Sequence, residues 1–286
     1  MKPAQIIDNY PESDYFAHEA LSCSEFKKFM QSGEAYQSYL NGEFEFKNYG
    51  SLDLGTAIHL ALLEPERYPH TVIHTGAVDK RRSEWKQAVA NKLPGQILFT
   101  QKETKKVERI LSQAKRAGFT DLFKTTKNEQ TIFWRYEDVP CRSRVDAMSD
   151  DGCIYDLKTT SASDVKAFKF DMRRYKYDVQ AWFYSNAYFS MHGAWPKKFH
   201  FKALQTVAPY GAFTVSITPE AFIETDALCT QKMKEFISQS KENVWLPEVL
   251  PDEVVTYDAS YAFQQGLPTN LAMMAKVNEL KGAFEC

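Results

Sequence analysis

The segment Asp156-Leu157-Lys158 places a carboxylate and an ammonium group two residues apart in an apolar run. If this run is a β-strand, both side chains lie on the same face, because side chains alternate along a strand. Asp146 lies near the end of the preceding strand-like run, so a hairpin would bring both carboxylates to one end of a sheet. Converging carboxylates repel each other unless a cation lies between them, and Mg²⁺ prefers such oxygen ligands. The pattern indicates metal-assisted chemistry, in which Lys158 orients or activates a water or holds charge that develops on a phosphate.

The same three side chains also fit a purely structural role. Asp146 could cap its turn, and Asp156 and Lys158 could form an exposed ion pair, which is common in proteins and contributes little stability. Taken alone, the triplet favours this structural interpretation. The assignment therefore depends on the rest of the sequence.

Two residues from other segments could complete a metal site. Glu129 begins the strand-like run before Asp146 and could supply a third carboxylate, or it could be a charge at a strand edge. His59 lies one helical turn after Gly55 in an apolar segment. It could be a neutral imidazole ligand, although a lone histidine in such a helix is more often a core residue whose hydrogen bonds are satisfied.

Polar residues of two further segments could contact a nucleic acid. Gln180 and Tyr184 are one turn apart on an aromatic helical segment, so they share a face and could hydrogen-bond a nucleotide or the lysine, although the segment is mainly core. Arg142 and Arg144 alternate along the strand that leads to Asp146, so they also share a face. They could grip a phosphate bidentately, or they could pair with surface acids.

The charge distribution is uneven although the net charge is only −2. Residues 1–69 and 217–286 each carry 5 Lys/Arg and 11 Asp/Glu, whereas residues 70–216 carry 25 and 15. A basic centre suits a protein that contacts a polyanion on one internal face, while chance clustering on solvated helices is the alternative. Sequence-independent contacts to a nucleic-acid backbone are predicted for Lys80, Arg81, Arg82, Lys166, Lys169, Arg173, Arg174 and Lys176.

The elements that must position these groups follow from periodicity and turn residues. A β-meander is predicted from strands at 129–136, 141–149 and 153–160, and a further hairpin from 197–207 and 211–219. Capping and apolar spacing predict helices at 21–33, 34–42, 51–68, 81–95, 101–118, 161–175, 177–193, 218–240 and 269–282, with short strands at 68–76 and 96–100. Helices around a small mixed sheet favour one α/β domain with helical additions at both ends.

The composition fits an ordinary globular protein. The 286 residues are 44% hydrophobic and 25% charged, and no apolar run is long enough to span a bilayer. The five scattered cysteines argue for reduced thiols in a cytoplasm and against a disulfide framework or a C-x-x-C metal site. No secretion signal is evident at the N-terminus.

The order of the motifs resembles that of the PD-(D/E)xK nucleases, and more narrowly their RecB-like branch. The motifs are G-T-A-I-H at 55–59, the strand glutamate 129, R-S-R-V-D at 142–146, D-L-K at 156–158 and Q-A-W-F-Y at 180–184. The segments 21–40 and 79–89 further resemble the exonuclease VIII (RecE-type) nuclease domain of phages and prophages. The resemblance covers about residues 20–240, and the cysteine cluster of the related iron–sulfur nucleases is absent.

This resemblance implies a restriction-endonuclease-like fold in a single nuclease domain over 1–286, with a core at about 20–240 and a C-terminal extension at 241–286. It implies Mg²⁺, or Mn²⁺ in its place, bound by His59, Asp146 and Asp156. Lys158 would assist the attacking water and Glu129 would support the site. Gln180 and Tyr184 would position the substrate or the lysine.

The resemblance also implies an activity and partners. The enzyme would degrade one strand of linear double-stranded DNA from its 5′ end and leave a 3′ single strand for an annealing protein. It would act as a ring-shaped homo-oligomer, a trimer or tetramer, in a bacterial cytoplasm. Alternatives are a CRISPR-associated or repair nuclease of the same superfamily and a non-catalytic DNA-binding recombination module. A metal enzyme for small molecules is disfavoured by the basic central segment.

Overall fold

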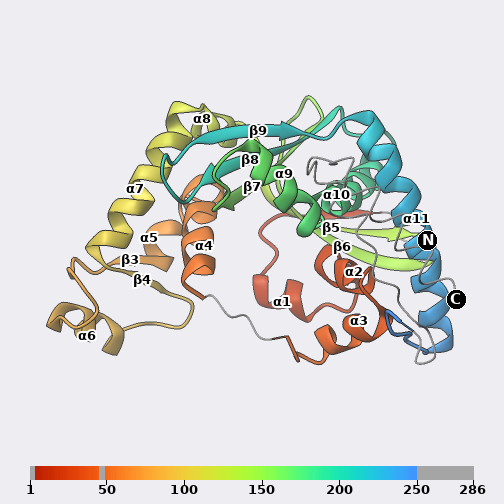
Figure 1. The fold of residues 1–286 in the computed structure, drawn as a ribbon, viewed down its shortest axis with the longest axis horizontal. Coiled ribbons are helices and arrows are strands. Elements are labelled where there is room, and N and C mark those ends of the chain that lie inside the picture. The colour runs from red at the N-terminus through yellow and green to blue at the C-terminus, as the bar shows by residue number, and fades with distance from the viewer. Residues whose placement is uncertain (1–3, 45–48, 250–286) are drawn as a thin grey trace, which may run out of the picture. The chain divides into compact units, whose positions relative to one another are not determined.

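The fold centres on a mixed sheet whose strands come from both halves of the chain (Figure 1). The structure is a computed structural model in which residues 4–44 and 49–249 are described. A first unit extends to Leu246, and a second begins at Pro247, of which only 247–249 are described. The helix predicted at 269–282 lies outside the described residues.

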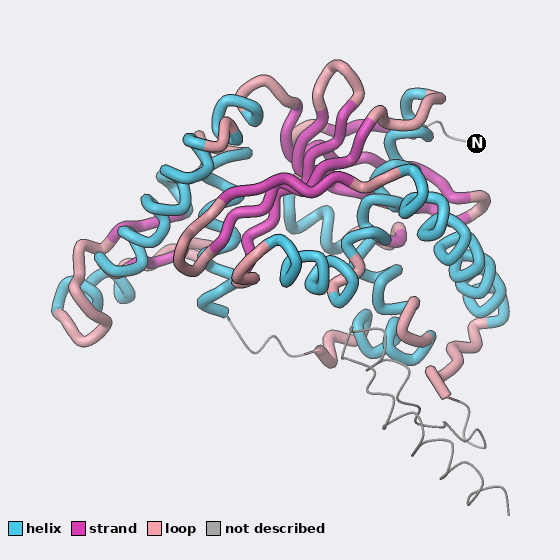
Figure 2. The backbone as a smooth tube through the Cα atoms, turned by 45° about the horizontal axis from the view of Figure 1, so that its top comes forward, coloured by secondary structure: helices cyan, strands magenta, loops and turns pink. Residues whose placement is uncertain are grey.

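Seven strands form the sheet, in the order β1-β5-β6-β7-β8-β9, with β2 paired to β6. The pairs β2–β6 and β7–β8 are parallel and the others are antiparallel. Figure 2 shows these strands with helices on both faces. The strands are β1 (Gln5–Ile7), β2 (Leu21–Ser22), β5 (Lys127–Tyr136), β6 (Val139–Met148), β7 (Cys153–Thr160), β8 (Lys198–Gln205) and β9 (Ala212–Ser216).

Strand β6 shares one of its edges between two partners. At its end, Ala147 and Met148 pair with β7, and these are the only two register pairs between the strands. At its beginning, Cys141 and Arg142 pair with β2. Asp146 lies in the interval between the two partners. The sheet is therefore open at the position where the sequence places its first candidate carboxylate.

Helices cover both faces of the sheet. One core contains Trp182, Phe183 and Phe201 and lies against α2 (Cys23–Phe29), α9 (Val165–Arg174), α10 (Tyr177–His192) and α11 (Pro219–Glu242). The other contains Ile58 and Leu157 and lies against α4 (Tyr49–Leu63), α7 (Gln101–Arg116) and α8 (Phe119–Phe123). The remaining elements are α1 (Glu12–Ala17), α3 (Gly33–Leu40), α5 (Tyr68–Thr71), β3 (Val72–His74), α6 (Ser83–Ala90) and β4 (Ile97–Phe99).

The expected α/β architecture, a mixed sheet flanked by helices, is confirmed. The meander and the later hairpin form as β5-β6-β7 and β8-β9. Helix α2 begins with the predicted capping box, in which Glu25 N–H donates to Ser22 Oγ and Ser22 N–H donates to the Glu25 carboxylate. Helix α11 begins with Pro219 in its first turn, where the missing N–H costs nothing.

The prediction of one strand at 68–76 is wrong in its first half. Residues Tyr68–Thr71 form helix α5, with Pro69 in its first turn, and only Val72–His74 pair as β3. The elements β1, α1, β2 and α8 were not expected, because each is too short to give a clear periodic signal. No helix within the described residues combines the length and the apolarity needed to cross a bilayer.

Candidate active site

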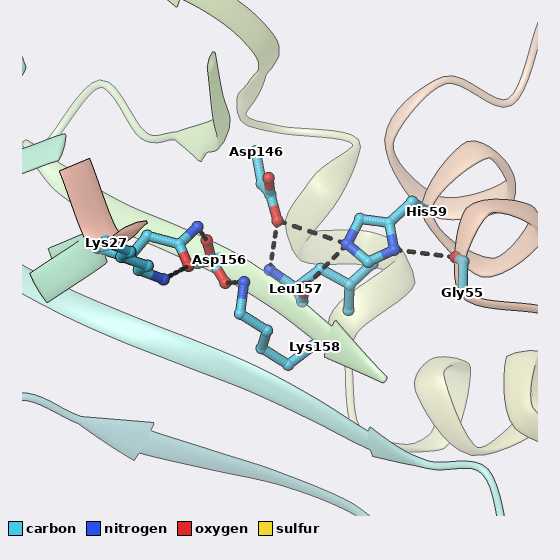
Figure 3. A network of polar contacts seen from close by, with 8 residues as sticks. Lys27, Gly55, His59, Asp146, Asp156, Leu157 and Lys158 are labelled. Atoms are coloured by element: carbon cyan, nitrogen blue, oxygen red, sulfur yellow. Dashed lines mark hydrogen bonds and ion pairs between the residues drawn. The ribbon is translucent and has the colours of Figure 1, made fainter. Parts of the chain in front are cut away.

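The residues Asp156 and Lys158 lie side by side on β7, as strand alternation predicts (Figure 3). The ammonium group of Lys158 forms an ion pair with Asp156 Oδ1, and Gln180 Nε2 donates to Asp156 Oδ2 at 2.6 Å. Asp156 is fully buried, so this is not the exposed surface pair of the structural alternative. Its two oxygens thus face different partners, Oδ1 the Lys158 ammonium and Oδ2 the Gln180 amide.

The residues Asp146 and His59 meet at the backbone of Leu157, between the two catalytic candidates of β7. Leu157 N–H donates to Asp146 Oδ2 at 2.7 Å, and His59 Nε2 lies 2.8 Å from the Leu157 carbonyl oxygen. His59 Nε2 is also 3.7 Å from Asp146 Oδ2. Two carboxylate-bearing strands and helix α4 thus converge at the gap between β6 and β7, as Figure 3 shows.

Gly55 explains how α4 approaches β7 closely enough to place His59. A Cβ atom at Gly55 would lie 3.2 Å from Thr159 Oγ1, which is tighter than ordinary packing. The Gly55 carbonyl oxygen lies 3.0 Å from His59 Nδ1. Each ring nitrogen of His59 therefore faces a carbonyl oxygen. A carbonyl oxygen only accepts hydrogen bonds, so the ring makes both bonds only when both nitrogens carry a proton.

Glu129 adds a third carboxylate in a strained backbone conformation. The register around it pairs Asn128 with Ala147 and Gln130 with Val145, so Glu129 lies opposite Asp146. Its φ is +51°, a left-handed value that is uncommon for a non-glycine residue in a strand and often marks a functional site. Burial and the charge of Asp146 raise the pKa of Glu129 to about 8, despite the opposing effect of His59.

The pKa values of the other site residues show how closely the charges interact. Burial raises the pKa of Asp156 to about 6, although Lys158 opposes this shift. Burial lowers the pKa of Lys158, but the charges of Asp156 and Asp146 outweigh it, so the net shift is upward. Burial also lowers the pKa of His59, while its hydrogen bond and charge interaction with Asp146 raise it to about 9. Lys158 and His59 are therefore the positive charges that balance these carboxylates when no metal is bound.

Part of this set opens onto a cavity of about 880 Å³, whose lining does not include Asp156 or Lys158. Its lining includes His59, Glu129, Arg144, Asp146 and Tyr184. Gln180 does not line this cavity and contacts Asp156 directly. The cavity is large enough for a nucleotide-sized ligand.

The donor set fits a hard divalent ion. Carboxylate oxygens, a backbone carbonyl and an imidazole meet around His59 and Asp146, and Oδ1 of Asp156, which faces Lys158, is a further oxygen donor. Within residues 4–44 and 49–249, no three His, Cys, Asp or Glu side chains already form a metal-binding cluster. In this arrangement Asp156 contacts Lys158 and Gln180.

Comparison with known families agrees with this geometry. Residues 22–252 match the model of a family described as a PDDEXK-like domain of unknown function, DUF3799. The chain belongs to this family. The match includes every candidate residue of the site, and this PDDEXK-like domain is a nuclease of the PD-(D/E)xK type. Nucleases of this type use divalent metal ions, which is consistent with the donor set.

A solved structure has the same fold. A protein from Eubacterium rectale, provisionally described as an exonuclease, superposes with a TM-score of 0.62 at 15% identity, over 89% of this chain and 96% of its own. A phage-related exonuclease from Haemophilus somnus 129PT gives a TM-score of 0.32 at 13% identity, over 80% of this chain and 99% of its own, and carries no structural argument. The curated proteins give no significant match.

The two arginines of β6 have different environments in this PDDEXK-like domain, although both face Tyr15 as alternation predicts. Arg142 is 2% exposed, pairs with Glu25 at 2.6 Å and lines a smaller cavity of about 340 Å³, and its contact with DNA stays a prediction. Arg144 lines the catalytic cavity and donates to the Tyr10 carbonyl oxygen at 2.7 Å, and its phosphate contact stays a prediction.

The other candidate DNA contacts lie in two exposed groups. Lys166, Lys169, Arg173 and Arg174 are exposed on α9. Arg81 and Arg82 are exposed just before α6, where Arg81 pairs with Asp79 at 3.1 Å. The loop after α6 lines the catalytic cavity through Pro94, Gly95 and Gln96. Their DNA contacts stay predictions.

Four features of the site were not predicted from the sequence. The Leu157 carbonyl is a backbone group, which no residue type reveals. Glu64 and Thr159 line the cavity. Glu64 also raises the pKa of Glu129, by less than burial and the charge of Asp146 do. Lys27 Nζ donates to Gln180 Oε1 at 3.4 Å from an N-terminal helix far away in sequence. Glu64 could have been noticed, because it follows His59 on the same apolar segment.

Replacement of Arg142 by alanine tests its structural role. The change leaves the Glu25 carboxylate without its partner, so we expect the free energy of unfolding to fall by about 3–5 kcal/mol, as when one partner of a buried pair is removed. Urea denaturation measures this loss. The exposed Arg173→Ala is the control, with an expected change within about 0.5 kcal/mol. Unchanged stability together with weakened DNA binding would instead assign Arg142 to a DNA contact.

Replacement of Glu129 by glutamine tests the electrostatic conflict at the site. A carboxyl group with a raised folded-state pKa binds a proton that the unfolded chain has released, so stability falls as pH rises from 4.5 to about 8. We expect Glu129→Gln to stabilise the metal-free protein at pH 9 by roughly 1–3 kcal/mol and to change it much less at pH 4. Urea denaturation in chelator at both pH values measures this. Equal effects at both pH values would contradict the shift.

Proposed function

We propose that this nuclease is an Mg²⁺-dependent exonuclease that degrades one strand of linear double-stranded DNA in the 5′ to 3′ direction. The observation that supports catalysis best is the buried Asp156–Lys158 pair beside Asp146 and His59 at the gap between β6 and β7. End-directed digestion is supported by the RecE-type resemblance of the N-terminal segments and by the exonuclease description of the structural neighbour. The polarity rests on the resemblance.

The metal would be held by His59, Asp146, Asp156 and the Leu157 carbonyl oxygen, with Mn²⁺ expected to substitute. A divalent ion at this position supplies Lewis-acid stabilisation of the charge on the phosphoryl oxygens. Glu129 lies opposite Asp146 and adds negative charge that favours cation binding. The strained backbone at Glu129 costs local stability, and such strain is common where a side chain must be held in a functional position.

The residues of the chain divide the remaining tasks. Lys158 is protonated at neutral pH, because the net shift of its pKa is upward, so it donates hydrogen bonds and does not accept a proton. It holds the attacking water or a phosphate oxygen in place while negative charge grows. Arg144 on the cavity wall binds the neighbouring phosphate, and Tyr184 bounds the nucleotide space.

The wider assembly is also part of the proposal. The 3′ single strand left by digestion would pass to a single-strand annealing protein for phage-type recombination. A ring-shaped homo-oligomer, a trimer or tetramer, would enclose the duplex and keep it bound between steps. The exposed basic residues of α9 supply sequence-independent contacts for such tracking.

Replacement of Lys158 by methionine tests its role. The change keeps the aliphatic stem and removes the ammonium, so we expect kcat to fall by roughly 10²–10³-fold. The affinities for duplex DNA and for Mn²⁺ should change much less, because Lys158 is not a metal ligand. Digestion rates, filter binding and calorimetry measure these quantities, with the exposed Lys234→Met as the matched control. A parallel loss of DNA affinity and rate would assign Lys158 to binding instead.

A timed digestion tests the polarity and the need for an end. On linear duplex labelled at either the 5′ or the 3′ end, we expect labelled 5′ mononucleotides to appear first, and only when Mg²⁺ is present. Closed circular duplex should remain intact under the same conditions. Early loss of the 3′ label overturns the polarity, cleavage of the circle overturns end dependence, and full activity in excess chelator overturns the metal requirement.

A further inference from the structure

Helix α2 brings a second lysine to the catalytic carboxylate. The helix begins at the capping box directly after β2, which pairs with β6 beside the gap in the sheet. Lys27 Nζ donates to Gln180 Oε1 at 3.4 Å. It also lies 5.6 Å from the centre of the Tyr177 ring, and Lys158 Nζ lies 5.0 Å from the same centre. Two lysines from distant segments therefore lie close to the same Tyr177 ring beside Asp156.

The neighbouring lysine has a different environment. Lys28 Nζ lies 3.6 Å from the centre of the Phe44 ring and 5.7 Å from that of Tyr39, on another side of α2. Both lysines are partly buried residues of one short helix, and only Lys27 contacts a residue of the site. The chain thus provides a matched control one position away.

The hydrogen-bonding chemistry of Gln180 makes the Lys27 contact directional. A protonated lysine only donates hydrogen bonds, and an ionised carboxylate only accepts them. The Gln180 amide lies between such groups, because Lys27 faces its Oε1 and Asp156 Oδ2 accepts from its Nε2 at 2.6 Å. One orientation of the amide satisfies both neighbours. The flipped orientation would place oxygen against carboxylate and NH₂ against ammonium.

We propose that Lys27 is a positioning residue of the nuclease site, which orients the Gln180 amide so that it holds Asp156 Oδ2 and leaves Oδ1 facing Lys158. This inference rests on the proposed function for its catalytic consequence. The geometry of the relay itself, from Lys27 through Gln180 to Asp156, is independent of the substrate. Without Lys27 the amide is oriented by Asp156 alone, so Asp156 is held less firmly in its position beside Lys158.

A double-mutant cycle tests this relay. The variants are Lys27→Met, Gln180→Leu and their combination, with Lys28→Met as the control. We expect each single relay variant to lower kcat on labelled duplex and the affinity for Mn²⁺ by roughly 10–100-fold, as for other residues that orient metal ligands. The combined variant should be no worse than the weaker single variant, because both changes break one relay. Lys28→Met should stay within about twofold of the wild type, and Lys27→Arg, which keeps a donor, should recover part of the loss.

Three outcomes would overturn the inference. Additive losses in the combined variant would mean that Lys27 acts by a route other than Gln180. A loss confined to DNA affinity in chelator would make Lys27 a substrate contact. A fall in the thermal midpoint for Lys27→Met that accounts for the lost activity would make it a structural residue. If the wild type cleaves no DNA, the proposed function fails, while the cycle read by Mn²⁺ calorimetry still decides whether the relay exists.

Discussion

The early separation of β6 from β7 is the constraint on which the rest of the site depends. Once the strands part, the Leu157 N–H and carbonyl can no longer pair with β6, and unpaired backbone groups are costly inside a protein. Asp146 accepts from the N–H, and the His59 ring lies against the carbonyl oxygen. The side chains that repair the broken ladder are thus the same ones that converge as candidate metal ligands. The site is a consequence of the opening in the sheet and not an addition to its surface.

The same opening concentrates charge. Asp146, Asp156 and Glu129 lie within one poorly solvated region, and the raised pKa values of Glu129 and Asp156 record the cost of burying them together. In the metal-free protein that cost is offset in part by the cations of Lys158 and His59. A divalent ion can replace the His59 proton and lessen the repulsion among carboxylates. Metal binding and relief of electrostatic strain are therefore the same event, and the site trades stability for cation affinity.

The positions of several site residues follow from local sequence rules. The others depend on which elements pack or pair with each strand in the folded protein. Alternation is sufficient to place Asp156 beside Lys158, and helical spacing places His59 one turn after Gly55. The opening of the sheet is invisible in the sequence, because it depends on the two-residue strand β2 taking over the edge of β6. The contribution of Leu157 is a backbone oxygen with no side-chain signature. Lys27 is equally hidden, because only the tertiary fold brings α2 to the aromatic helix α10.

The contrast between Arg142 and Arg144 shows why face assignment alone does not identify a functional residue. The two side chains share a face of β6 and both lie over Tyr15, yet one is buried against Glu25 and the other lines the cavity. Helices α1 and α2 pack over Arg142 and leave Arg144 facing the cavity. A charged residue under that cover must be neutralised by a partner within the protein, whereas a residue beyond it is free to bind a ligand of opposite charge. The same strand thus changes from a covered position at Arg142 to a position at Arg144 that faces the cavity, within two residues.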